Sequence, residues 1–426
     1  MATARFDPAG PLRGALRPPP DKSVSHRAAL IAAMGEGETT IEGYLDAADT
    51  RSTLAAVEAL GAQVTVGPRV RVRGVGLRGA SPAAVDVGNA GTLLRLLPGW
   101  LAGQETGSWT LDGDDSIRRR PVDRVAAPLR LMGARIEARE DRLPPIEIEG
   151  APLRGISYEL PVASAQVKSC LLFAGLLAEG ETRIAEPLPT RDHSERMLAA
   201  AGAEVERGEG VVTVRSASLL EPGEIVVPAD FSSAAFFIVA ALLVPGSDIG
   251  LTGVGLNPTR TGLLGILGRM GARIEVEEEG ERGGEPGGRL RVRGSELRGT
   301  EVGGGEIPLA IDELPLVALA ACFAEGETTI RDAAELRRKE SDRIETVSAA
   351  LTALGAAVAT SEDGMRIAGA GGLRGGAVDS RGDHRIAMLG AVAGLASRGG
   401  VEVAGMDAAA VSYPGFEADL ASLLHG

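Results

Sequence analysis

The sequence predicts an α/β protein made of six similar units that follow one another along the chain. Five helical stretches each end at a Gly-Ala pair, whose glycines are Gly61, Gly133, Gly202, Gly271 and Gly355. These glycines are 72, 69, 69 and 84 residues apart, and a sixth, similar helical stretch lies at 418–424. A spacing of about 70 residues exceeds that of solenoid repeats, so we expect each unit to be a small α/β subdomain.

The elements of each unit come in the same order. A short strand leads to a few polar residues and an apolar helix, and then a β-rich segment and a second, more polar helix follow. Alternating apolar and charged residues, as at 70–73, predict half-exposed strands. The glycine after each second helix suits the C′ position, where the backbone dihedral φ is often positive. The one long interval contains the polar stretch 275–288, which we predict to be an exposed loop insertion.

The composition excludes several classes of protein. Of the 426 residues, 44% are hydrophobic, which is enough for a large core and argues against disorder. The net charge of −14 argues against a nucleic-acid binder, because such a protein needs a basic face. Aromatic residues make up only 3%, so platforms for base stacking are not expected either. A net-negative protein that binds anions must therefore concentrate its cations locally.

The cysteines and the apolar stretches bear on the compartment. Cys170 and Cys322 lie in apolar runs, where a cysteine is usually a buried thiol, so no disulfide is expected. The first 20 residues lack the apolar core of a secretory signal. The longest apolar stretch, 234–244, is too short to span a bilayer. The four histidines show no metal-ligand spacing. We expect a cytoplasmic protein with no membrane association and no metal.

Polar residues gather at the start of the apolar helix in every unit. The six positions are 21–23, 89–92, 164–166, 230–232, 312–313 and 383–385. Helix capping accounts for the Ser, Asn and Asp residues among them. It does not account for Lys22, Arg27 and Arg385, because a cation near a helix N-terminus opposes the helix dipole. Such cations are favourable if an anion is bound at the same place.

A second group of cations lies at the start of the polar helices, at 118–121, 190–193 and 337–343. For Arg118 and Arg337 we prefer a solvated charged turn. Lys339 and Arg343 are four residues apart and share one helix face, with Glu340 beside them. A carboxyl group among cations has a lowered pKa, so it can act as an acid only if burial or a bound anion raises that pKa. These patterns predict an enzyme that binds two small anionic substrates between two halves of the chain.

Five motifs carry a resemblance to a known family, and they lie at 21–27, 88–92, 120–121, 338–343 and 383–388. Together they resemble the 5-enolpyruvylshikimate-3-phosphate (EPSP) synthase family over essentially the whole chain. The resemblance implies a two-domain inside-out α/β barrel built from six βαβαββ repeats. One domain would contain residues 1–19 and 229–426, and the other would contain residues 20–228. Substrates would bind in the cleft between the domains of a monomer, with no cofactor.

The resemblance also implies the reaction and its residues. The enolpyruvyl group of phosphoenolpyruvate would move to the 5-hydroxyl of shikimate 3-phosphate, with release of phosphate. Asp312 would accept the proton of the hydroxyl and Glu340 would protonate the methylene carbon, with Lys22 as a third catalytic residue. The positions that match shikimate 3-phosphate contacts are Lys22, Ser23, Arg27, Ser164, Ala165, Gln166, Arg191, Asp312 and Lys339. Those that match phosphoenolpyruvate contacts are Lys22, Gly91, Arg120, Gln166, Arg343 and Arg385.

Three positions depart from the family pattern. Val411 stands near a phosphate-binding lysine of many members, Leu96 stands where many have proline, and Glu335 stands near a common asparagine. Glycine at position 91, where members insensitive to the inhibitor glyphosate often carry alanine, favours at least partial sensitivity.

Two alternatives remain open at this point. A related transferase acts on UDP-N-acetylglucosamine and usually carries a loop cysteine, which the corresponding stretch 112–121 lacks. A non-catalytic anion-binding protein on the same scaffold would need neither Asp312 nor Glu340.

Overall fold

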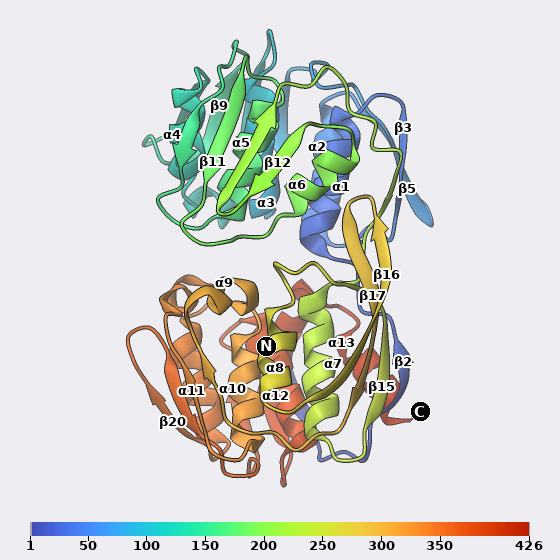
Figure 1. Ribbon diagram of the computed structural model, residues 1–426, viewed down its shortest axis with the longest axis vertical. Coiled ribbons are helices and arrows are strands. Elements are labelled where there is room, and N and C mark those ends of the chain that lie inside the picture. Colours follow the sequence, from blue (N-terminus) through green and yellow to red (C-terminus); the bar gives the residue numbers. More distant parts are fainter. Residues whose placement is uncertain (1, 426) are drawn as a thin grey trace. The chain divides into compact units, whose positions relative to one another are not determined.

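The computed structural model describes residues 2–425 and divides into two compact units (Figure 1). Met1 and Gly426, which the sequence assigns to the ends of the discontinuous domain, lie outside the described residues. Unit 1 comprises the chain before Pro20, residues 229–280 and the chain after Pro286. Unit 2 comprises residues 20–228 together with the short segment 281–286.

Unit 2 contains three sheets and six α-helices. Its strands are β3 (Glu38–Glu42), β4 (Gln63–Thr65), β5 (Arg69–Arg73), β6 (Ala83–Asp86), β7 (Ser108–Asp112), β8 (Arg135–Arg139), β9 (Leu143–Glu149), β10 (Ser157–Glu159), β11 (Glu181–Ala185), β12 (Val205–Gly208), β13 (Val211–Arg215) and β14 (Glu224–Val226). Its helices are α1 (Lys22–Met34), α2 (Ala48–Ala59), α3 (Gly91–Ala102), α4 (Asp123–Leu131), α5 (Ala165–Gly175), α6 (His193–Ala200) and the 3₁₀ turn η1 (Ile117–Arg119). The sheet orders are β14-β3-β5-β4, β6-β7-β9-β8 and β10-β11-β13-β12.

Unit 1 contains the other three sheets. Its strands are β1 (Thr3–Phe6), β2 (Arg13–Leu16), β15 (Asp248–Gly255), β16 (Arg273–Arg282), β17 (Glu285–Arg293), β18 (Glu301–Val302), β19 (Glu327–Ile330), β20 (Ala357–Thr360), β21 (Met365–Ala368), β22 (Gly376–Asp379) and β23 (Val401–Ala404). Its helices are α7 (Phe231–Leu243), α8 (Gly262–Arg269), α9 (Ile307–Ala310), α10 (Leu314–Phe323), α11 (Arg343–Ala353), α12 (His384–Ala396) and α13 (Phe416–Leu424), with 3₁₀ turns η2 (Gly304–Glu306), η3 (Ala334–Arg338) and η4 (Met406–Val411). The sheet orders are β16-β17-β15-β2, β18-β19-β21-β20 and β1-β23-β22.

Five of these sheets share one pattern, which is the expected βαβαββ repeat. An outer strand pairs parallel with the second strand, and the remaining pairs are antiparallel, as in β6-β7-β9-β8. Where the chain crosses between units, the leading strand is exchanged: β14 pairs with β3, and β2 pairs with β15. The last sheet has three strands, because the N-terminal β1 pairs antiparallel with β23 in place of a closing hairpin.

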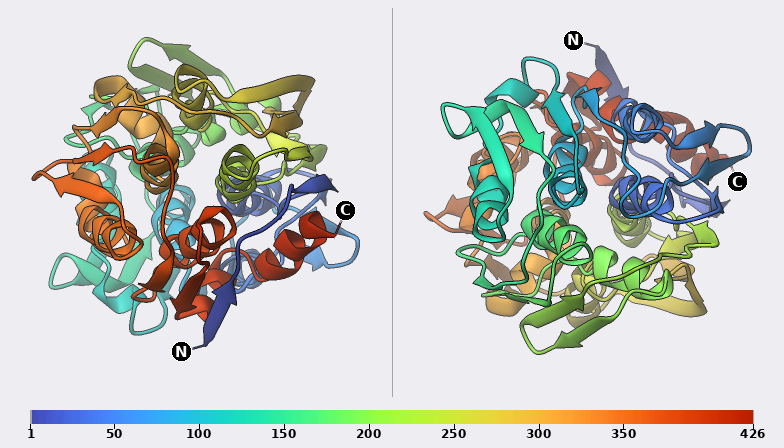
Figure 2. Two further views of the ribbon diagram at one scale, coloured as in Figure 1. Left: turned by 90° about the horizontal axis from the view of Figure 1, so that it is seen from below. Right: turned by 90° about the horizontal axis from the view of Figure 1, so that it is seen from above.

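The apolar helix of each repeat is buried, as the sequence predicts. These helices are α1, α3 and α5 in unit 2 and α7, α10 and α12 in unit 1. Figure 2 looks along them, and within each unit the strands lie toward the edge. Each unit has its own hydrophobic cluster around its three helices. The expected C′ glycines are confirmed, since the five repeat glycines have φ between +93° and +103°.

The stretch 275–288 corrects a prediction from the sequence. We expected an exposed loop, and the structure instead forms the hairpin of β16 and β17. Most β16 side chains are exposed, so the strand lacks the alternation that marks a half-buried strand in a sequence. Backbone pairing with β17, rather than side-chain burial, defines β16 as a strand. The tip of the hairpin, 281–286, clusters with unit 2, although we assigned all of 229–426 to the other domain.

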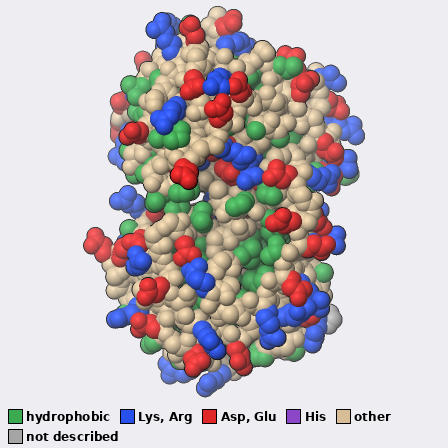
Figure 3. Space-filling model, viewed as in Figure 1, with side chains coloured by type: hydrophobic (Ala, Val, Ile, Leu, Met, Phe, Trp, Pro, Cys, Tyr) green, Lys and Arg blue, Asp and Glu red, His purple; other side chains and the backbone are tan. Residues whose placement is uncertain are grey.

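The remaining sequence expectations concern the cysteines and the surface. Both cysteines are free and buried, and burial raises the pKa of the Cys322 thiol to about 12. Within residues 2–425, no helix is both long enough and apolar enough to cross a bilayer. On the face drawn in Figure 3, acidic and basic side chains are interspersed.

The close packing of α3 against α5 gives a first prediction. A Cβ atom on Gly99 would lie 2.0 Å from the carbonyl oxygen of Cys170, and backbone cannot yield as a flexible side chain can. We expect Gly99→Ala to lower the free energy of unfolding by roughly 1–3 kcal/mol, the usual cost of overpacking. Chemical denaturation measures this change.

The matched control is Gly265→Ala on α8, an exposed helix position where an added Cβ meets nothing within 4 Å. This variant should gain up to about 1 kcal/mol, because alanine favours helix over glycine. Wild-type stability in Gly99→Ala would show that the two helices separate easily.

Candidate functional site

In unit 1, four cations surround the carboxylate of Asp312, which lies between α9 and α10. The nearest is Arg343, whose Nη1 lies 3.4 Å from Asp312 Oδ1. The other three, with their distances to an Asp312 carboxylate oxygen, are Arg260 Nη1 (3.6 Å), Lys339 Nζ (3.8 Å) and Arg385 Nη2 (3.9 Å). Arg385 also donates a 2.9 Å hydrogen bond to the Asp312 backbone carbonyl. The fold thus brings the predicted base together with three predicted anion-binding cations.

Arg343 is fixed by a buried ion pair. The side chain is 1% exposed, and its Nε lies 2.9 Å from Oδ2 of Asp383, which is fully buried. Asp383 also caps α12 by accepting a 2.9 Å hydrogen bond from the Arg385 backbone N–H. Burial alone would raise the pKa of the Asp383 carboxyl, but hydrogen bonds and charge from Arg343 outweigh it and hold the pKa below its ordinary value.

Glu340, the predicted acid, contacts the other end of the same guanidinium. Its Oε2 lies 2.6 Å from Arg343 Nη2, and its side chain is 56% exposed. Desolvation is the largest single effect on the pKa of Glu340 and acts to raise it, but the charge of Arg343, a backbone hydrogen bond and His384 together outweigh it, and the pKa is lowered. Glu340 is therefore ionised at neutral pH in this arrangement, as expected for a carboxyl group among cations.

Two further groups in this cluster were not selected from the sequence as site residues. Arg260 donates a 2.7 Å hydrogen bond to the Ser232 hydroxyl, and that hydroxyl donates to the carboxylate of Glu313. Glu313 is 1% exposed and lies 3.6 Å from Arg385, and burial raises the pKa of its carboxyl. The repeat offers a sequence signal for Arg260, because Arg260 precedes α8 by two residues just as Arg191 precedes α6.

In unit 2, Arg27 is held by neutral groups. It is 2% exposed, and it donates to the hydroxyls of Ser194 (2.8 Å) and Ser169 (3.0 Å) and to the carbonyl of Ser23 (3.0 Å). Burial lowers the pKa of Arg27 to about 10, which leaves it charged at neutral pH. Lys22, in the first turn of the same helix, lies 3.0 Å from Asp49 and is 41% exposed.

The other predicted contacts of unit 2 gather at the start of α3. Arg120 donates a 3.0 Å hydrogen bond to the side chain of Asn89, and Gln166 donates a 3.2 Å bond to the hydroxyl of Thr92. A Cβ atom on Gly91 would lie 2.6 Å from Arg120 Nη1, so the glycine leaves this guanidinium room beside the helix.

Arg95 is a cation of this region that the sequence analysis missed. Its Nη1 donates to the carbonyl of Gly91 at 3.2 Å, one helical turn away. Burial first, and then the charges of Arg124 and Arg120, lower the pKa of Arg95 to about 10. Three like charges near one helix N-terminus favour a bound anion. The signal was the four-residue spacing from Gly91, which places Arg95 on the same helix face.

Three more predicted residues lie at or just before the starts of α5 and α6. Ser164 caps α5 by accepting a 3.4 Å hydrogen bond from Val167, Ala165 is the first residue of that helix, and Arg191 is half-buried. Arg118 and Arg337 form the charged turns that we preferred, with ion pairs to Asp112 (2.8 Å) and Asp342 (2.6 Å).

The two histidines of the motifs are not poised to titrate near neutral pH. Burial lowers the pKa of His26 to about 3 and that of His384 to about 4. Within residues 2–425, no group of three His, Cys, Asp or Glu side chains could hold a metal ion.

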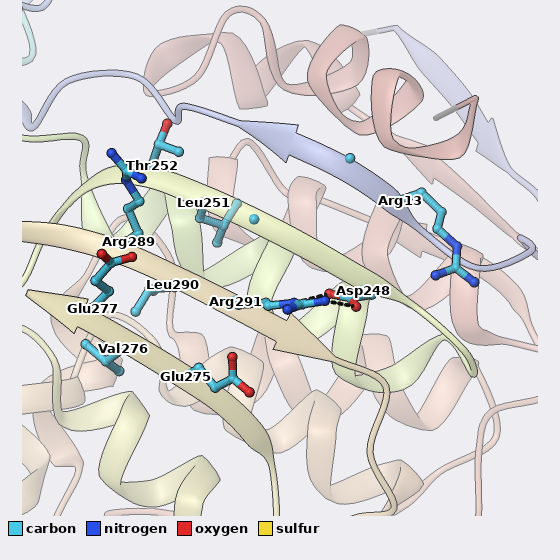
Figure 4. Close-up of a pocket in the computed structure, with 12 residues that line it drawn as sticks. Arg13, Asp248, Leu251, Thr252, Glu275, Val276, Glu277, Arg289, Leu290 and Arg291 are labelled. Carbon is cyan, nitrogen blue, oxygen red and sulfur yellow. Dashed lines mark hydrogen bonds and ion pairs between the residues drawn. The ribbon is translucent and has the colours of Figure 1, made fainter.

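A groove of about 580 Å³ lies on the sheet of unit 1 (Figure 4). Residues of β2, β15, β16 and β17 line it, and Arg291 and Asp248 are two of these residues. No predicted site residue lines this groove.

The three departures from the family pattern lie in different surroundings. Val411 ends η4 with 65% exposure, and Leu96 is fully buried in α3. Glu335 lies 3.1 Å from Lys339, so it supplies a carboxylate partner to a cation of the cluster.

Comparison with known proteins gives a consistent result. The family model described as EPSP synthase (3-phosphoshikimate 1-carboxyvinyltransferase) matches residues 6–420. A protein of Thermus thermophilus named 3-phosphoshikimate 1-carboxyvinyltransferase is 53% identical over 99% of both chains. A protein of Synechococcus sp. with the same name is 51% identical over 99% of this chain and 96% of its own length.

Solved structures agree with these matches. An EPSP synthase from Acinetobacter baumannii superposes with a TM-score of 0.93 at 41% identity, covering 99% of this chain and 98% of that one. The enolpyruvyl transferase NikO from Streptomyces tendae has a TM-score of 0.78 at 19% identity, covering 98% and 96%, which shows a shared fold.

The buried pair of Arg343 and Asp383 gives a second prediction. Because the folded pKa of Asp383 is below the unfolded value of about 3.9, the pair stabilises the protein above that pH, and the stabilisation is lost as pH falls through the folded pKa. At pH 7, Asp383→Asn leaves a buried charge unpaired and should cost about 3–5 kcal/mol. Denaturation from pH 7 down to pH 3 should show the difference from wild type shrinking.

The matched control is Asp7→Asn, which removes an exposed ion pair of the same unit. It should change stability by less than about 1 kcal/mol at every pH. A difference for Asp383→Asn that is independent of pH would contradict the assignment of charge to this pair.

Proposed function

The chain belongs to the EPSP synthase (3-phosphoshikimate 1-carboxyvinyltransferase) family, and on this premise we propose that it transfers the enolpyruvyl group of phosphoenolpyruvate to the 5-hydroxyl of shikimate 3-phosphate, releasing phosphate. The reaction is a step of the shikimate pathway toward aromatic amino acids. The observation that carries the proposal is the cluster of unit 1, where Asp312 and Glu340 both contact Arg343. A base, an acid and an anion-binding cation thus lie within reach of one another.

Each carboxyl group has a distinct role in the proposed mechanism. Asp312 accepts the proton of the 5-hydroxyl, and Glu340 delivers a proton to the methylene carbon of phosphoenolpyruvate. The hydroxyl oxygen then bonds to the adjacent, electron-poor carbon and gives a tetrahedral intermediate. Loss of phosphate and of one methyl proton restores the double bond. These are proton transfers and an addition–elimination, which positioned carboxyl groups and cations can catalyse without a cofactor.

The cations hold the substrates and also set the acidity of Glu340. Lys22, Gly91, Arg120, Gln166, Arg343 and Arg385 are proposed to hold phosphoenolpyruvate. Shikimate 3-phosphate is proposed to contact Lys22, Ser23, Arg27, Ser164, Ala165, Gln166, Arg191, Asp312 and Lys339. A substrate anion at Arg343 competes with Glu340 for the guanidinium. The pKa of Glu340 therefore rises when the substrate binds, which lets the carboxyl carry the proton it must deliver.

Phosphate release is the test that separates this function from its alternatives. Purified protein with shikimate 3-phosphate and phosphoenolpyruvate should release phosphate, and UDP-N-acetylglucosamine should not replace the first substrate. Binding of both substrates without turnover would instead support a non-catalytic anion-binding protein. A monomeric state and a cytoplasmic location remain predictions from the sequence.

Glu340→Gln tests the acid. Glutamine keeps the size of the side chain and a hydrogen bond but cannot deliver the proton, so turnover should fall by at least about a hundredfold, while both substrates still bind. Steady-state kinetics and equilibrium binding measure the two effects. Glu345→Gln, an exposed position on α11 that pairs with Arg381 at 3.3 Å, is the control and should keep wild-type turnover. Full activity in Glu340→Gln would remove Glu340 from the mechanism.

Gly91→Ala tests how glyphosate would fit. The added Cβ would lie 2.6 Å from Arg120 Nη1 and 3.2 Å from Arg95 Nη1, so both guanidiniums must shift. The wild type should show at least partial sensitivity. The variant should bind the longer inhibitor more weakly by roughly 1–3 kcal/mol, with a smaller effect on phosphoenolpyruvate. Inhibition constants for glyphosate, determined in competition with phosphoenolpyruvate, measure the affinity of the wild type and of the variant. Gly265→Ala is the control. Equal glyphosate affinity in Gly91→Ala and wild type would show that this loop does not limit the pocket.

A further inference from the structure

A buried lysine joins three elements of unit 2 near the predicted substrate contacts. Lys168 lies on α5, is 1% exposed, and its Nζ lies 2.7 Å from one oxygen of Glu186 and 2.7 Å from one oxygen of Glu195. Glu186 directly follows β11, and Glu195 lies in the first turn of α6. One ammonium group therefore ties together a helix, the end of a strand and the next helix.

The same network fixes the loop that carries Arg191. The second oxygen of Glu186 accepts a hydrogen bond from the hydroxyl of Thr190, the residue before Arg191. The loop 186–192 is thus held at its start by Lys168, closed on itself by the bond from Thr190, and followed by a helix that Glu195 anchors. These contacts therefore restrain the chain on both sides of Arg191.

A second set of bonds lies directly beside the first. Ser169 follows Lys168 on α5, and Ser194 precedes Glu195 on α6. The Ser194 hydroxyl donates to the Ser169 hydroxyl at 2.7 Å, and Arg27 donates to both. Two parallel bridges between α5 and α6 therefore exist, one of charged groups and one of hydroxyls. The hydroxyl bridge holds Arg27.

Stability alone gives no clear reason for the charged bridge. Burying two carboxylates and an ammonium costs desolvation that their attraction often fails to recover, and apolar residues of similar volume are frequently as stable or more so. A buried ion network does fix geometry, because each partner accepts only a few positions. Because this ion network lies beside Arg27 and Arg191, the geometry that it fixes is the position of these two arginines.

We propose that Lys168, with Glu186, Glu195 and Thr190, positions Arg27 and Arg191 for the anionic groups of shikimate 3-phosphate. These four residues are positioning residues that act through the two arginines and touch no substrate. The inference rests on the proposed function, since it concerns binding of one substrate of that reaction. It predicts a selective effect: binding of shikimate 3-phosphate depends on the network, and binding of phosphoenolpyruvate does not.

Two variants test this inference in different ways. Lys168→Met combined with Glu186→Gln and Glu195→Gln removes the network without leaving a buried charge. Thr190→Val removes only the bond between Thr190 and Glu186, and Thr190→Ser, which keeps the hydroxyl, is its matched control. The wild type and each variant are assayed for KM of both substrates, for kcat, and for the folded fraction by circular dichroism.

The triple variant should raise KM for shikimate 3-phosphate by about tenfold or more, since small displacements of positioning groups have effects of this size. Thr190→Val should also raise KM for shikimate 3-phosphate, and Thr190→Ser should have the KM of the wild type. KM for phosphoenolpyruvate should stay within about twofold, because the residues proposed for that substrate at Gly91 and Arg120 lie outside the network.

Three outcomes would overturn the inference. Unchanged KM for shikimate 3-phosphate in both the triple variant and Thr190→Val would show that the network is not needed for binding. Equal increases in KM for both substrates, or a fall in apparent kcat that follows the folded fraction while both KM values stay unchanged, would assign the network a purely structural role. A wild-type protein that releases no phosphate overturns the proposed function and this inference with it. The first two outcomes, obtained with a wild type that does release phosphate, overturn the inference alone.

Discussion

Burial of six apolar helices along most of their length is the constraint on which the rest of the structure depends. The first N–H groups of such a helix have no partner within the helix and must find acceptors at its start. Side chains supply them in α1, α5, α7 and α12, through Asp21, Ser164, Asp230 and Asp383. These capping residues therefore lie at one end of a buried helix. Lys22, Gln166 and Arg385 all lie in such first turns, and burial of the helices thus decides where chemistry can occur.

The repeat and the helices could be predicted from the sequence, because periodic burial and C′ glycines leave local signals. Five βαβαββ units and the positive φ of residues such as Gly61 are confirmed, and in the sixth unit β1 takes the place of the closing hairpin. The repeat alone did not predict the exchange of β2 and β14 between leading positions, since strand pairing depends on where the chain crosses. The family resemblance did assign residues 1–19 to the domain that contains residues 229–426. The loop predicted at 275–288 was wrong for a related reason: β16 is defined by backbone hydrogen bonds, which no side-chain pattern reports.

The residues of the candidate site were likewise predicted only in part. Motifs at helix starts identified Arg343, Asp312 and Arg120, whose side chains do gather into clusters. Arg95 and Arg260 were missed, because neither stands in a charged run and their importance follows from what the fold packs beside them. Whether the predicted residues contact the substrates stays a prediction. Sequence patterns alone place residues on helix faces, and they cannot show which faces meet.

Two arginines of unit 2, Arg27 and Arg120, differ in their partners from Arg343 of unit 1, and this difference has a chemical consequence. In unit 2, Arg27 is held by serine hydroxyls and Arg120 by the side chain of Asn89. Neutral partners orient a guanidinium without cancelling its charge, so these cations keep their attraction for an anionic substrate. In unit 1, Arg343 is instead paired with carboxylates. An anion binding there must displace a carboxylate, and the displaced group loses the charge that lowered its pKa. Orientation by neutral groups thus suits substrate capture, while pairing with carboxylates couples substrate binding to the protonation that the proposed reaction needs.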